Sequence, residues 1–343
     1  ITYFKSIKET SVSHLVGSEQ FKNVLRELQD LINARLHKVL ESTHPPILYE
    51  PIQYVLESNG KRIRPILLLL SCKASGGDVD RCWDAAVAVE LLHNFTLVHD
   101  DIMDRDDTRR GQPTVHKKWD TDIALLAGDG LLALAYQALL RTQSERIQEI
   151  VKIFTDGIVE LCEGQALDRE FETRKDVQLK DYLLMIGKKT ARLLNVSARI
   201  GALIGAGDKR AAQALGEFGY NLGCAFQIQD DLLDITSNEE IIGKTCGSDV
   251  RRKKQTYLLV HALNHADRET RHALTEILYN STIHKSQISE IKRIFDKIGS
   301  IAAAHAAINQ FISSAQKNLK ELPSTRGKED LANLLTFILH RQA

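Results

Sequence analysis

Two short clusters of aspartate are the residues of this sequence whose type and spacing most clearly favour chemistry. Both have the form DDxxD, and they comprise Asp100, Asp101 and Asp104 in the first cluster and Asp230, Asp231 and Asp234 in the second. On a helix, the first and last carboxylates of such a cluster lie one turn apart on the same face, where like charges repel. A bound cation would relieve this repulsion. Carboxylate oxygens suit a hard divalent ion, and Mg²⁺ in particular combines one or two carboxylates with water and phosphate oxygens.

The segments around the two clusters strengthen this interpretation. The first cluster follows an apolar segment at 85–98 that reads as a buried helix, and negative charge is unfavourable at the C-terminal end of a helix. In the second cluster, the three aspartates and Gln227 form a polar stripe along an apolar helix, which costs free energy unless the groups are paired or bind metal. A single acidic run would normally be a solvated surface, but two of the same form in apolar segments favour metal binding.

Four basic clusters accompany the acidic ones, at 60–65, 109–110, 187–190 and 244–254. Arginine offers a planar fork of donors for phosphate oxygens, and lysine offers a compact point charge. Each basic cluster by itself would be an ordinary exposed patch. Together with the acidic clusters they indicate two polyanionic substrates, one held through metal and the other by side chains alone. Diphosphates fit this description.

The elements that position these residues are predicted to be helices. Only Pro323 follows Pro113, so 114–322 contains no proline, the strongest helix breaker. Apolar residues recur with helical period from Phe21 to Leu36. A further helix is expected over 123–140, with Thr121 or Asp122 as its cap.

The same reading predicts where the helices are interrupted. Loops are expected near 41–52, 75–80, 105–118 and 236–252, and the Asn59-Gly60 pair is expected to lead into a helix with Pro65 in its first turn. Gly201 and Gly205 are expected to permit close helix packing. No linker or shift of composition marks a boundary, so we predict a single all-α domain over 1–343, a bundle of many helices.

Composition excludes several classes of protein. The 45 basic residues balance the 45 acidic ones, which argues against a nucleic-acid partner. Five cysteines without a CxxC pair argue against a disulfide framework or zinc ribbon and favour a reducing compartment. Wholly apolar runs such as 66–70 are far shorter than the ~20 residues of a membrane span, and no signal-peptide pattern opens the sequence. We expect a cytoplasmic protein with no integral membrane segment.

Taken together, these motifs resemble those of the trans-isoprenyl diphosphate synthases, also called polyprenyl synthetases. The matching segments are GKRIRP at 60–65, the block at 93–116 around the first DDxxD, GKKTARL at 187–193, FQIQDDLLD at 226–234 and the segment 244–256. The resemblance implies an all-α fold surrounding a central catalytic cavity, usually in a homodimer, with the two DDxxD motifs facing each other. It also implies two or three Mg²⁺ ions in each active site.

The resemblance further implies a role for each matching residue. The six cluster aspartates would serve the metal, with Asp100, Asp104 and Asp230 as ligands and Asp101, Asp231 and Asp234 in support, while Asp168 and Asp249 would join through water. The allylic diphosphate would bind Arg109, Lys189, Lys244 and Lys254. The metal-free isopentenyl diphosphate site would consist of Lys61, Arg64, His93 and Arg110, and the developing cation would be steadied by Thr190 and Gln227. One departure is visible, because the family often has glycine where Lys253 stands, so this loop is expected to be set differently.

The implied reaction is a head-to-tail prenyl transfer. The allylic diphosphate ionises, and the double bond of isopentenyl diphosphate attacks the resulting carbocation. Phe95 lies five residues before Asp100, about 7.5 Å along the same helix, and is predicted to act as the floor for the growing chain unless it is ordinary core packing. The sequence resembles the geranylgeranyl diphosphate synthases of the family at this position, whereas longer-chain synthases tend to have a small residue there. This resemblance implies a medium-length all-trans product, geranylgeranyl diphosphate, with farnesyl diphosphate or a longer chain as alternatives.

Two other classes remain as alternatives. A class I terpene cyclase also uses DDxxD, but its second metal motif is normally of the Asn/Ser/Glu kind, and an isopentenyl site near Lys61 would serve no purpose in it. A non-catalytic regulatory subunit of a heteromeric synthase typically has degraded aspartate motifs, whereas both motifs are complete here.

Overall fold

The chain folds almost entirely into helices, as the sequence predicts. The computed structural model describes residues 2–40, 43–58, 60–174, 176–205, 207–236, 247–279 and 283–339, and in the first helix only side chains from residue 19 onward. Contacts group the chain into two compact units, which interleave along the sequence. The first unit comprises Ile1–Phe154, Ser197–Leu215 and Leu322–Asn333, and the second comprises Thr155–Val196, Gly216–Glu321 and Leu334–Ala343.

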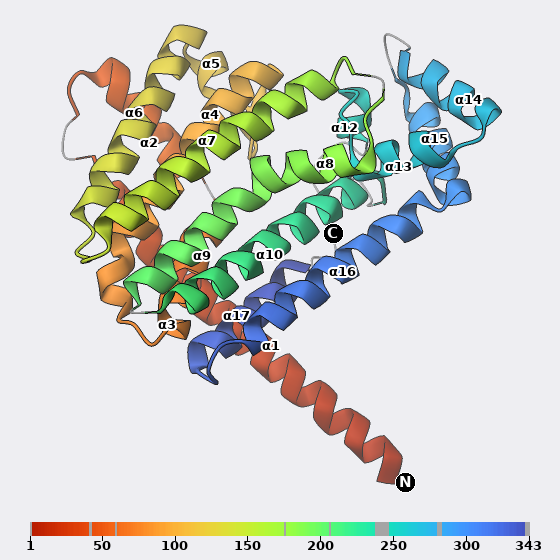
Figure 1. Cartoon of the computed structure of the whole chain (residues 1–343). Helices are drawn as coiled ribbons and strands as arrows, with labels where there is room; N and C mark the ends of the chain where they lie inside the picture. The colour runs from red at the N-terminus through yellow and green to blue at the C-terminus, as the bar shows by residue number, and fades with distance from the viewer. Residues whose placement is uncertain are drawn as a thin grey trace. The chain divides into compact units, whose positions relative to one another are not determined.

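Figure 1 labels the α-helices, and the bounds of all elements in chain order are as follows. Those that begin in the first stretch are α1 (Thr2–His37), α2 (Pro46–Glu57), α3 (Ile63–Ala74), the 3₁₀ turn η1 (Val79–Cys82), α4 (Trp83–Asp104), β1 (Thr108–Arg109), β2 (Gln112–Pro113), α5 (Val115–Lys118), α6 (Thr121–Arg141) and α7 (Ile147–Phe171). Then come α8 (Leu179–Ile186), the π-helical turn η2 (Gly187–Ala191), α9 (Arg192–Ile204), α10 (Lys209–Thr236), α12 (Ser248–Arg251), α13 (Tyr257–His265), α14 (Arg268–Tyr279), α15 (Lys285–Ile298), α16 (Ser300–Lys320) and α17 (Arg326–Leu339).

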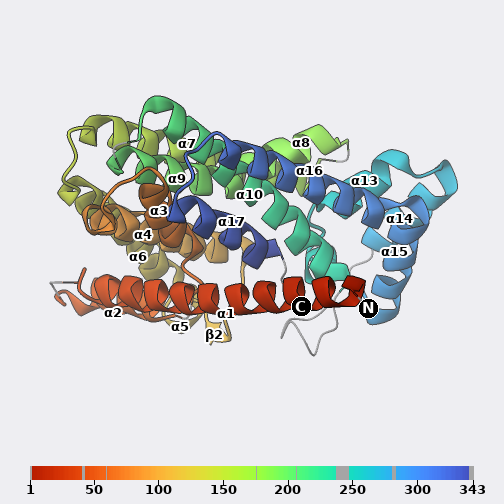
Figure 2. The ribbon, with the colours of Figure 1, turned by 90° about the horizontal axis from the view of Figure 1, so that it is seen from below.

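Helix α4 is the centre of the first unit. It is buried along most of its length and packs against α3, α6 and α2, while α1 runs along α2 and α4 (Figure 2). Gly201 of α9 and Gly205, the residue after that helix, lie against the carbonyls of Leu68 and Cys72 in α3, where an added Cβ would come within 2.0 and 2.5 Å of the carbonyl oxygens. The predicted close packing at these glycines is therefore confirmed. Because α3 in turn packs against α4, this packing supports the helix whose last turn carries the first aspartate cluster.

Helix α10 has the corresponding role in the second unit. Its side chains Cys224, Ala225, Ile228 and Leu232 enter a core that also contains residues of α8, α13, α15 and α16. Asn221 of α10 donates a hydrogen bond to the Asn318 side chain of α16 at 3.1 Å, and these two helices run side by side (Figure 1). Because one face of α10 is buried in this way, the stripe that carries the second aspartate cluster has a fixed orientation within the unit.

Four local predictions need correction. Of the loop expected at 236–252, residues 237–246 lie outside the described part of the chain, and Ser248–Arg251 form the short helix α12. The segment expected as a loop at 41–52 contains the start of α2, because Pro46 occupies the first helical turn, where its missing N–H costs nothing. The cap of α6 is Asp120, whose side chain accepts from the N–H of Ile123 at 2.8 Å, one residue before the predicted candidates. The 105–118 segment contains a two-stranded hairpin and the short helix α5 rather than a plain loop.

Among the described residues, α6 is the one helix whose length and apolar composition would suffice to cross a membrane. This helix contains no long wholly apolar run, because Asp129 and the neighbouring glycines interrupt its apolar residues. In its most apolar stretch of 18 residues, 44% is buried inside the protein, and the helix packs against α4 and α2. Buried core helices commonly share this length and composition, so the observation is weak evidence for a membrane span.

Candidate active site

The first aspartate cluster occupies the last turn of α4. The helix ends at Asp104, and Arg105 closes it in the left-handed conformation with φ 56°. Asp101 is buried, and its Oδ1 accepts from Nε and a terminal nitrogen of Arg109 at 2.7 and 2.6 Å. Burial raises the pKa of Asp101 above its ordinary value, although the bond from Arg109 opposes the shift. The middle aspartate of this cluster therefore holds an arginine, while Asp100 lies one turn before Asp104 on the same helix.

A tight hairpin directs the two arginines that follow. Strands β1 and β2 pair Arg109 with Gln112, and the connecting residues Arg110 and Gly111 both have positive φ, 52° and 77°. Two such residues are typical of the type I′ turn that suits the twist of a hairpin. Arg110 donates to the hydroxyl of Ser58 at 3.0 Å. The hairpin thus sends Arg109 to the acidic cluster and Arg110 to the loop after α2.

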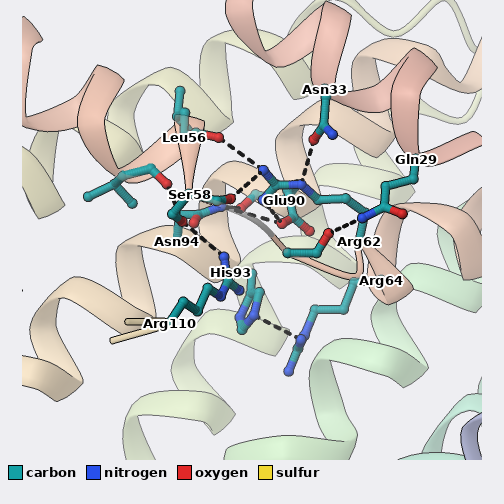
Figure 3. Close-up of polar contacts among 12 residues, drawn as sticks. Gln29, Asn33, Leu56, Ser58, Arg62, Arg64, Glu90, His93, Asn94 and Arg110 are labelled. Carbon is teal, nitrogen blue, oxygen red and sulfur yellow. Dashed lines mark hydrogen bonds and ion pairs between the residues drawn. The ribbon is translucent and has the colours of Figure 1, made fainter. Parts of the chain in front are cut away.

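Arg64, His93 and Arg110 meet in a donor-rich site of the first unit (Figure 3). Arg64 contacts Nε2 of His93 at 3.0 Å, and because a guanidinium only donates, this ring nitrogen accepts and Nδ1 carries the proton. Burial, and then the charges of Arg64 and Arg110, lower the pKa of His93 well below its ordinary value. Arg64 Nε and His93 Nδ1 are buried without a hydrogen-bond partner. A positive site with unused donors suits an anion.

Two residues of this site, Arg62 and Glu90, were not among those predicted from the sequence. Arg62 is buried and forms an ion pair with Glu90 at 2.7 Å. Burial lowers the pKa of the neighbouring Arg64 to about 10, and the charge of Glu90 opposes that shift. Glu90 could have been found, because a single acidic residue inside the apolar segment 85–98 requires a buried cationic partner.

The second cluster has its middle aspartate buried in the same way. Asp231 accepts from the hydroxyl of Tyr182 at 2.7 Å and the N–H of Tyr257 at 2.8 Å through Oδ2, and from Gln227 at 3.0 Å through Oδ1. Burial, followed by repulsion from Asp249, raises the pKa of Asp231 to about 7. Asp230, next to it, is exposed. Tyr182 and Tyr257 carry no sequence signal that distinguishes them from other core tyrosines.

Asp234 organises the chain from residue 247 onward. Its carboxylate accepts from the N–H and hydroxyl of Ser248 at 3.1 and 2.7 Å and from the N–H of Asp249 at 3.2 Å. Burial and repulsion from Asp234 raise the pKa of Asp249 to about 6, while Lys254 opposes the shift. Lys253 has φ 57°, so it adopts the left-handed conformation that the usual glycine would favour. Lys244 lies outside the described residues.

The π-helical turn η2 positions the remaining candidates. Nζ of Lys189 contacts the buried carboxylate of Asp168 on α7 at 2.5 Å. Gly164 makes room for this approach, because a Cβ there would lie 2.3 Å from the backbone nitrogen of Lys189. Thr190 donates to the Gln227 side chain at 2.9 Å, which leaves the Gln227 amide to donate to Asp231. π-helical turns often occur at functional sites.

The carboxylates present fit Mg²⁺ better than a metal held entirely by protein. Among the described residues, no three His, Cys, Asp or Glu side chains gather closely enough to hold an ion by themselves. Mg²⁺ commonly binds through one or two carboxylates and completes its shell with water and phosphate oxygens. The pairs one turn apart on α4 and α10 match that donor set.

Phe95 is half-buried on α4, and its ring lies 4.7 Å from that of His99, the residue directly before the first cluster. Gly128 of α6 accommodates the imidazole, since a Cβ there would lie 2.1 Å from Nε2 of His99. Phe95 therefore belongs to an aromatic pair that lies one turn before the acidic cluster.

Comparison with known proteins defines the class. The sequence model of the family described as polyprenyl synthetase matches residues 45–298. The chain is 38% identical to a short chain isoprenyl diphosphate synthase of Methanothermobacter thermautotrophicus, over 93% of this chain and 98% of the relative. It is also 38% identical to a geranylgeranyl diphosphate synthase of Sulfolobus acidocaldarius, over 89% and 93% of the two chains.

Solved structures agree. The crystal structure of geranylgeranyl pyrophosphate synthetase from Pyrococcus horikoshii matches with a TM-score of 0.90 and 38% identity, covering 94% of this chain and 99% of that one. These likenesses define the class as all-α isoprenyl diphosphate synthases. The chain belongs to the polyprenyl synthetase family, and it is a prenyltransferase.

Proposed function

We propose that the protein condenses an allylic diphosphate with isopentenyl diphosphate, head to tail, and releases an all-trans prenyl diphosphate. The observation that carries this proposal is the donor site around Arg64 and His93, with its buried unpartnered Nε and Nδ1 and no carboxylate among the residues proposed to touch the substrate. A cyclase needs no second diphosphate site. Membership of the polyprenyl synthetase family supports the same reaction.

The two diphosphates would use different residues. The isopentenyl diphosphate would bind Lys61, Arg64, His93 and Arg110 without metal. The allylic diphosphate would bind Arg109, Lys189, Lys244 and Lys254, with Asp100, Asp104 and Asp230 as ligands of its magnesium ions and Asp168 and Asp249 joining through water. When bound, two or three Mg²⁺ ions would stabilise charge on the leaving diphosphate.

The side chains of the protein would act mainly by positioning and by charge. In the structure, Arg109 is held by Asp101 and Lys189 by Asp168, so both cations are oriented before substrate arrives. Cations aimed at the leaving group lower the barrier of ionisation because they favour the charge that develops there. The oxygens of Thr190 and Gln227 would face the developing carbocation, and Asp231 fixes the Gln227 amide.

The product is proposed to be of medium length, geranylgeranyl diphosphate, with Phe95 as the floor of the chain. The Sulfolobus acidocaldarius relative is a geranylgeranyl diphosphate synthase, which supports this length, and the name of the Methanothermobacter relative leaves shorter products as the alternative. The half-buried ring of Phe95, tilted by 60° against the ring of His99, has the bulk required of a floor.

We also propose a homodimer of single-domain, cytoplasmic subunits. Leu125, Leu126 and Leu140 of α6 are exposed by 44%, 53% and 63%, and an apolar face of this kind is more consistent with a subunit interface than with contact to water. The helices α7, α9, α10 and α17 each contribute residues to both compact units, which supports one domain.

The test is incubation of the purified protein with Mg²⁺, labelled isopentenyl diphosphate and, in separate reactions, dimethylallyl, geranyl or farnesyl diphosphate, with products sized by chromatography. We expect labelled prenyl diphosphates that end at one length. Failure to incorporate label with every primer would favour a regulatory subunit. Hydrocarbon formed without isopentenyl diphosphate would instead favour a cyclase.

A further inference from the structure

Arg62 has an unusual backbone conformation and lies between Lys61 and Arg64, two residues proposed to bind isopentenyl diphosphate. It is the residue before α3, with φ 50° and ψ 36°, a left-handed conformation that residues with a Cβ rarely adopt. Lys61 precedes it directly and Arg64 follows two residues later. Such a conformation persists only where the surroundings fix it, and it is often found at functional sites.

Four hydrogen bonds from one guanidinium fix this conformation (Figure 3). Nε donates to Asn33 of α1 at 2.8 Å, and one terminal nitrogen donates to Glu90 of α4 at 2.7 Å. The other terminal nitrogen donates to the carbonyls of Leu56 and Ser58, at the end of α2, at 2.9 and 3.1 Å. Arg62 therefore ties α1, α2 and α4 to the start of α3.

Ser58 extends this arrangement to a second arginine. Its carbonyl accepts from Arg62, and its hydroxyl accepts from Arg110 at 3.0 Å. Gly60 is held as well, since its carbonyl accepts from Gln29 at 2.6 Å. The position of Arg110 thus depends on Arg62 through one shared residue.

Glu90 supplies the negative charge that permits so many arginines in one place. Its side chain and that of Arg62 are each only 2% exposed, and Asn94 donates to the Glu90 carbonyl at 2.7 Å. The charge of Glu90 also reaches Arg64 and Arg110. Three arginines against one carboxylate leave an excess of positive charge, which an anionic ligand would neutralise.

We propose that Arg62, paired with Glu90, is the positioning residue of the isopentenyl diphosphate site. Its guanidinium fixes the segment that carries Lys61 and Arg64 and, through Ser58, the guanidinium of Arg110. Arg62 itself has four acceptors within the protein and does not bind the substrate. This inference rests on the proposed function, because it assigns isopentenyl diphosphate to the donor site.

Binding of isopentenyl diphosphate to the whole protein tests the inference without any reaction. Calorimetry is carried out in EDTA, with no allylic diphosphate present, on wild type, Arg62→Lys, Arg62→Met and the double variant Arg62→Met/Glu90→Leu. We expect Arg62→Met to weaken binding by on the order of tenfold to a hundredfold, since small displacements of binding groups have large effects. Lysine should restore part of the loss, because it keeps the charge but not the planar fork.

The double variant separates positioning from stability. Replacing a buried ion pair by apolar residues commonly restores stability. We therefore expect Arg62→Met/Glu90→Leu to unfold at nearly the wild-type temperature and still to bind isopentenyl diphosphate weakly, because the bonds to Leu56 and Ser58 remain absent. In steady-state assays its KM for isopentenyl diphosphate should rise, while its KM for the allylic diphosphate stays close to that of wild type.

Asp330→Asn is the matched control. Asp330 is a buried carboxylate of the same unit, paired with Lys73 at 2.8 Å and Arg326 at 3.4 Å, so its loss should lower stability without weakening isopentenyl diphosphate binding. Equal binding by wild type and all Arg62 variants would overturn the inference, and so would binding that recovers with stability in the double variant. A wild-type protein that does not bind isopentenyl diphosphate would instead refute the proposed function.

Discussion

The middle aspartate of each DDxxD cluster is buried and accepts hydrogen bonds from other side chains of the protein. Asp101 accepts both of its described bonds from Arg109, and Asp231 accepts from Tyr182, Tyr257 and Gln227. Burial raises the pKa of both carboxyls. The helical spacing that brings the first and last aspartates to one face also turns the middle one toward the interior.

Replacement of single aspartates should therefore separate catalysis from folding. We expect Asp100→Ala and Asp230→Ala to lower kcat by about a thousandfold or more, with little change in melting temperature, because each removes a proposed metal ligand. Asp231→Ala should lower both kcat and the melting temperature, since it leaves three buried or half-buried donors without their acceptor. The checks are kcat at saturating Mg²⁺ and the thermal midpoint. Near-normal turnover of Asp100→Ala or Asp230→Ala would contradict the metal assignment.

Phe95 is the residue on which product length is expected to depend. Phe95→Ala removes the ring that lies 4.7 Å from that of His99 and should allow the chain to grow by one or more isoprene units beyond that of wild type. Chromatography of the dephosphorylated products measures this. Leu97→Ala, on the same helix, serves as the control for general loosening of α4. An unchanged product distribution in Phe95→Ala would reduce Phe95 to ordinary core packing.

At the scale of elements, the π-helical turn η2 depends on a glycine of a different helix. Gly164→Ala would place a Cβ 2.3 Å from the backbone nitrogen of Lys189, so α7 and η2 would have to move apart. Overpacking of this kind typically costs about 1–3 kcal/mol. We expect a lower melting temperature and a KM for the allylic diphosphate that is raised several-fold, because Lys189 and Thr190 shift together.

Gly157→Ala on the same helix is the control for this prediction. Its Cβ would lie 2.6 Å from a methyl of Val196, which is a side chain rather than the backbone of η2. We expect it to lower stability while leaving the KM for the allylic diphosphate unchanged. If both variants changed KM equally, the turn would not be the element that positions Lys189.

The sequence predicts elements and motifs better than it predicts caps and partners. Helical period is a local property, so α4, α6 and α10 could be anticipated, whereas α2 could not, because Pro51 lies inside it. The Arg62–Glu90 pair joins residues 28 positions apart, which only folding brings together. Lys253 adopts a left-handed conformation with φ 57°, which the residue type gave no reason to expect.

At the scale of the whole molecule, the exposed leucines of α6 are expected to join two subunits. We predict a mass of twice the 38.5 kDa of one chain by light scattering. The double variant Leu126→Glu/Leu140→Glu should shift the mass toward that of a monomer, because buried like charges oppose association. Leu184→Glu is the control, since Leu184 of α8 is 50% exposed, close to the 53% of Leu126. A monomeric wild type would contradict the prediction.

The stability of the molecule should depend on pH through His93. Its folded-state pKa lies well below the ordinary value of 6.5, because burial and the surrounding arginines oppose the imidazolium. The unfolded chain therefore takes up a proton near pH 6.5 that the folded protein does not accept. Stability due to His93 is present above pH 6.5 and is lost as the pH falls through the lowered pKa.

The variant His93→Gln isolates this effect, since its amide oxygen can still accept from Arg64 but does not titrate. We expect wild type to lose unfolding free energy relative to His93→Gln as the pH falls from 7 to 5. Urea unfolding at four pH values measures it, and every other histidine contributes equally to both proteins. Parallel curves would mean that His93 is charged in the folded protein at pH 5. The arginine cluster would then accommodate a further positive charge. Its own excess of positive charge would be too small to bind a diphosphate without metal.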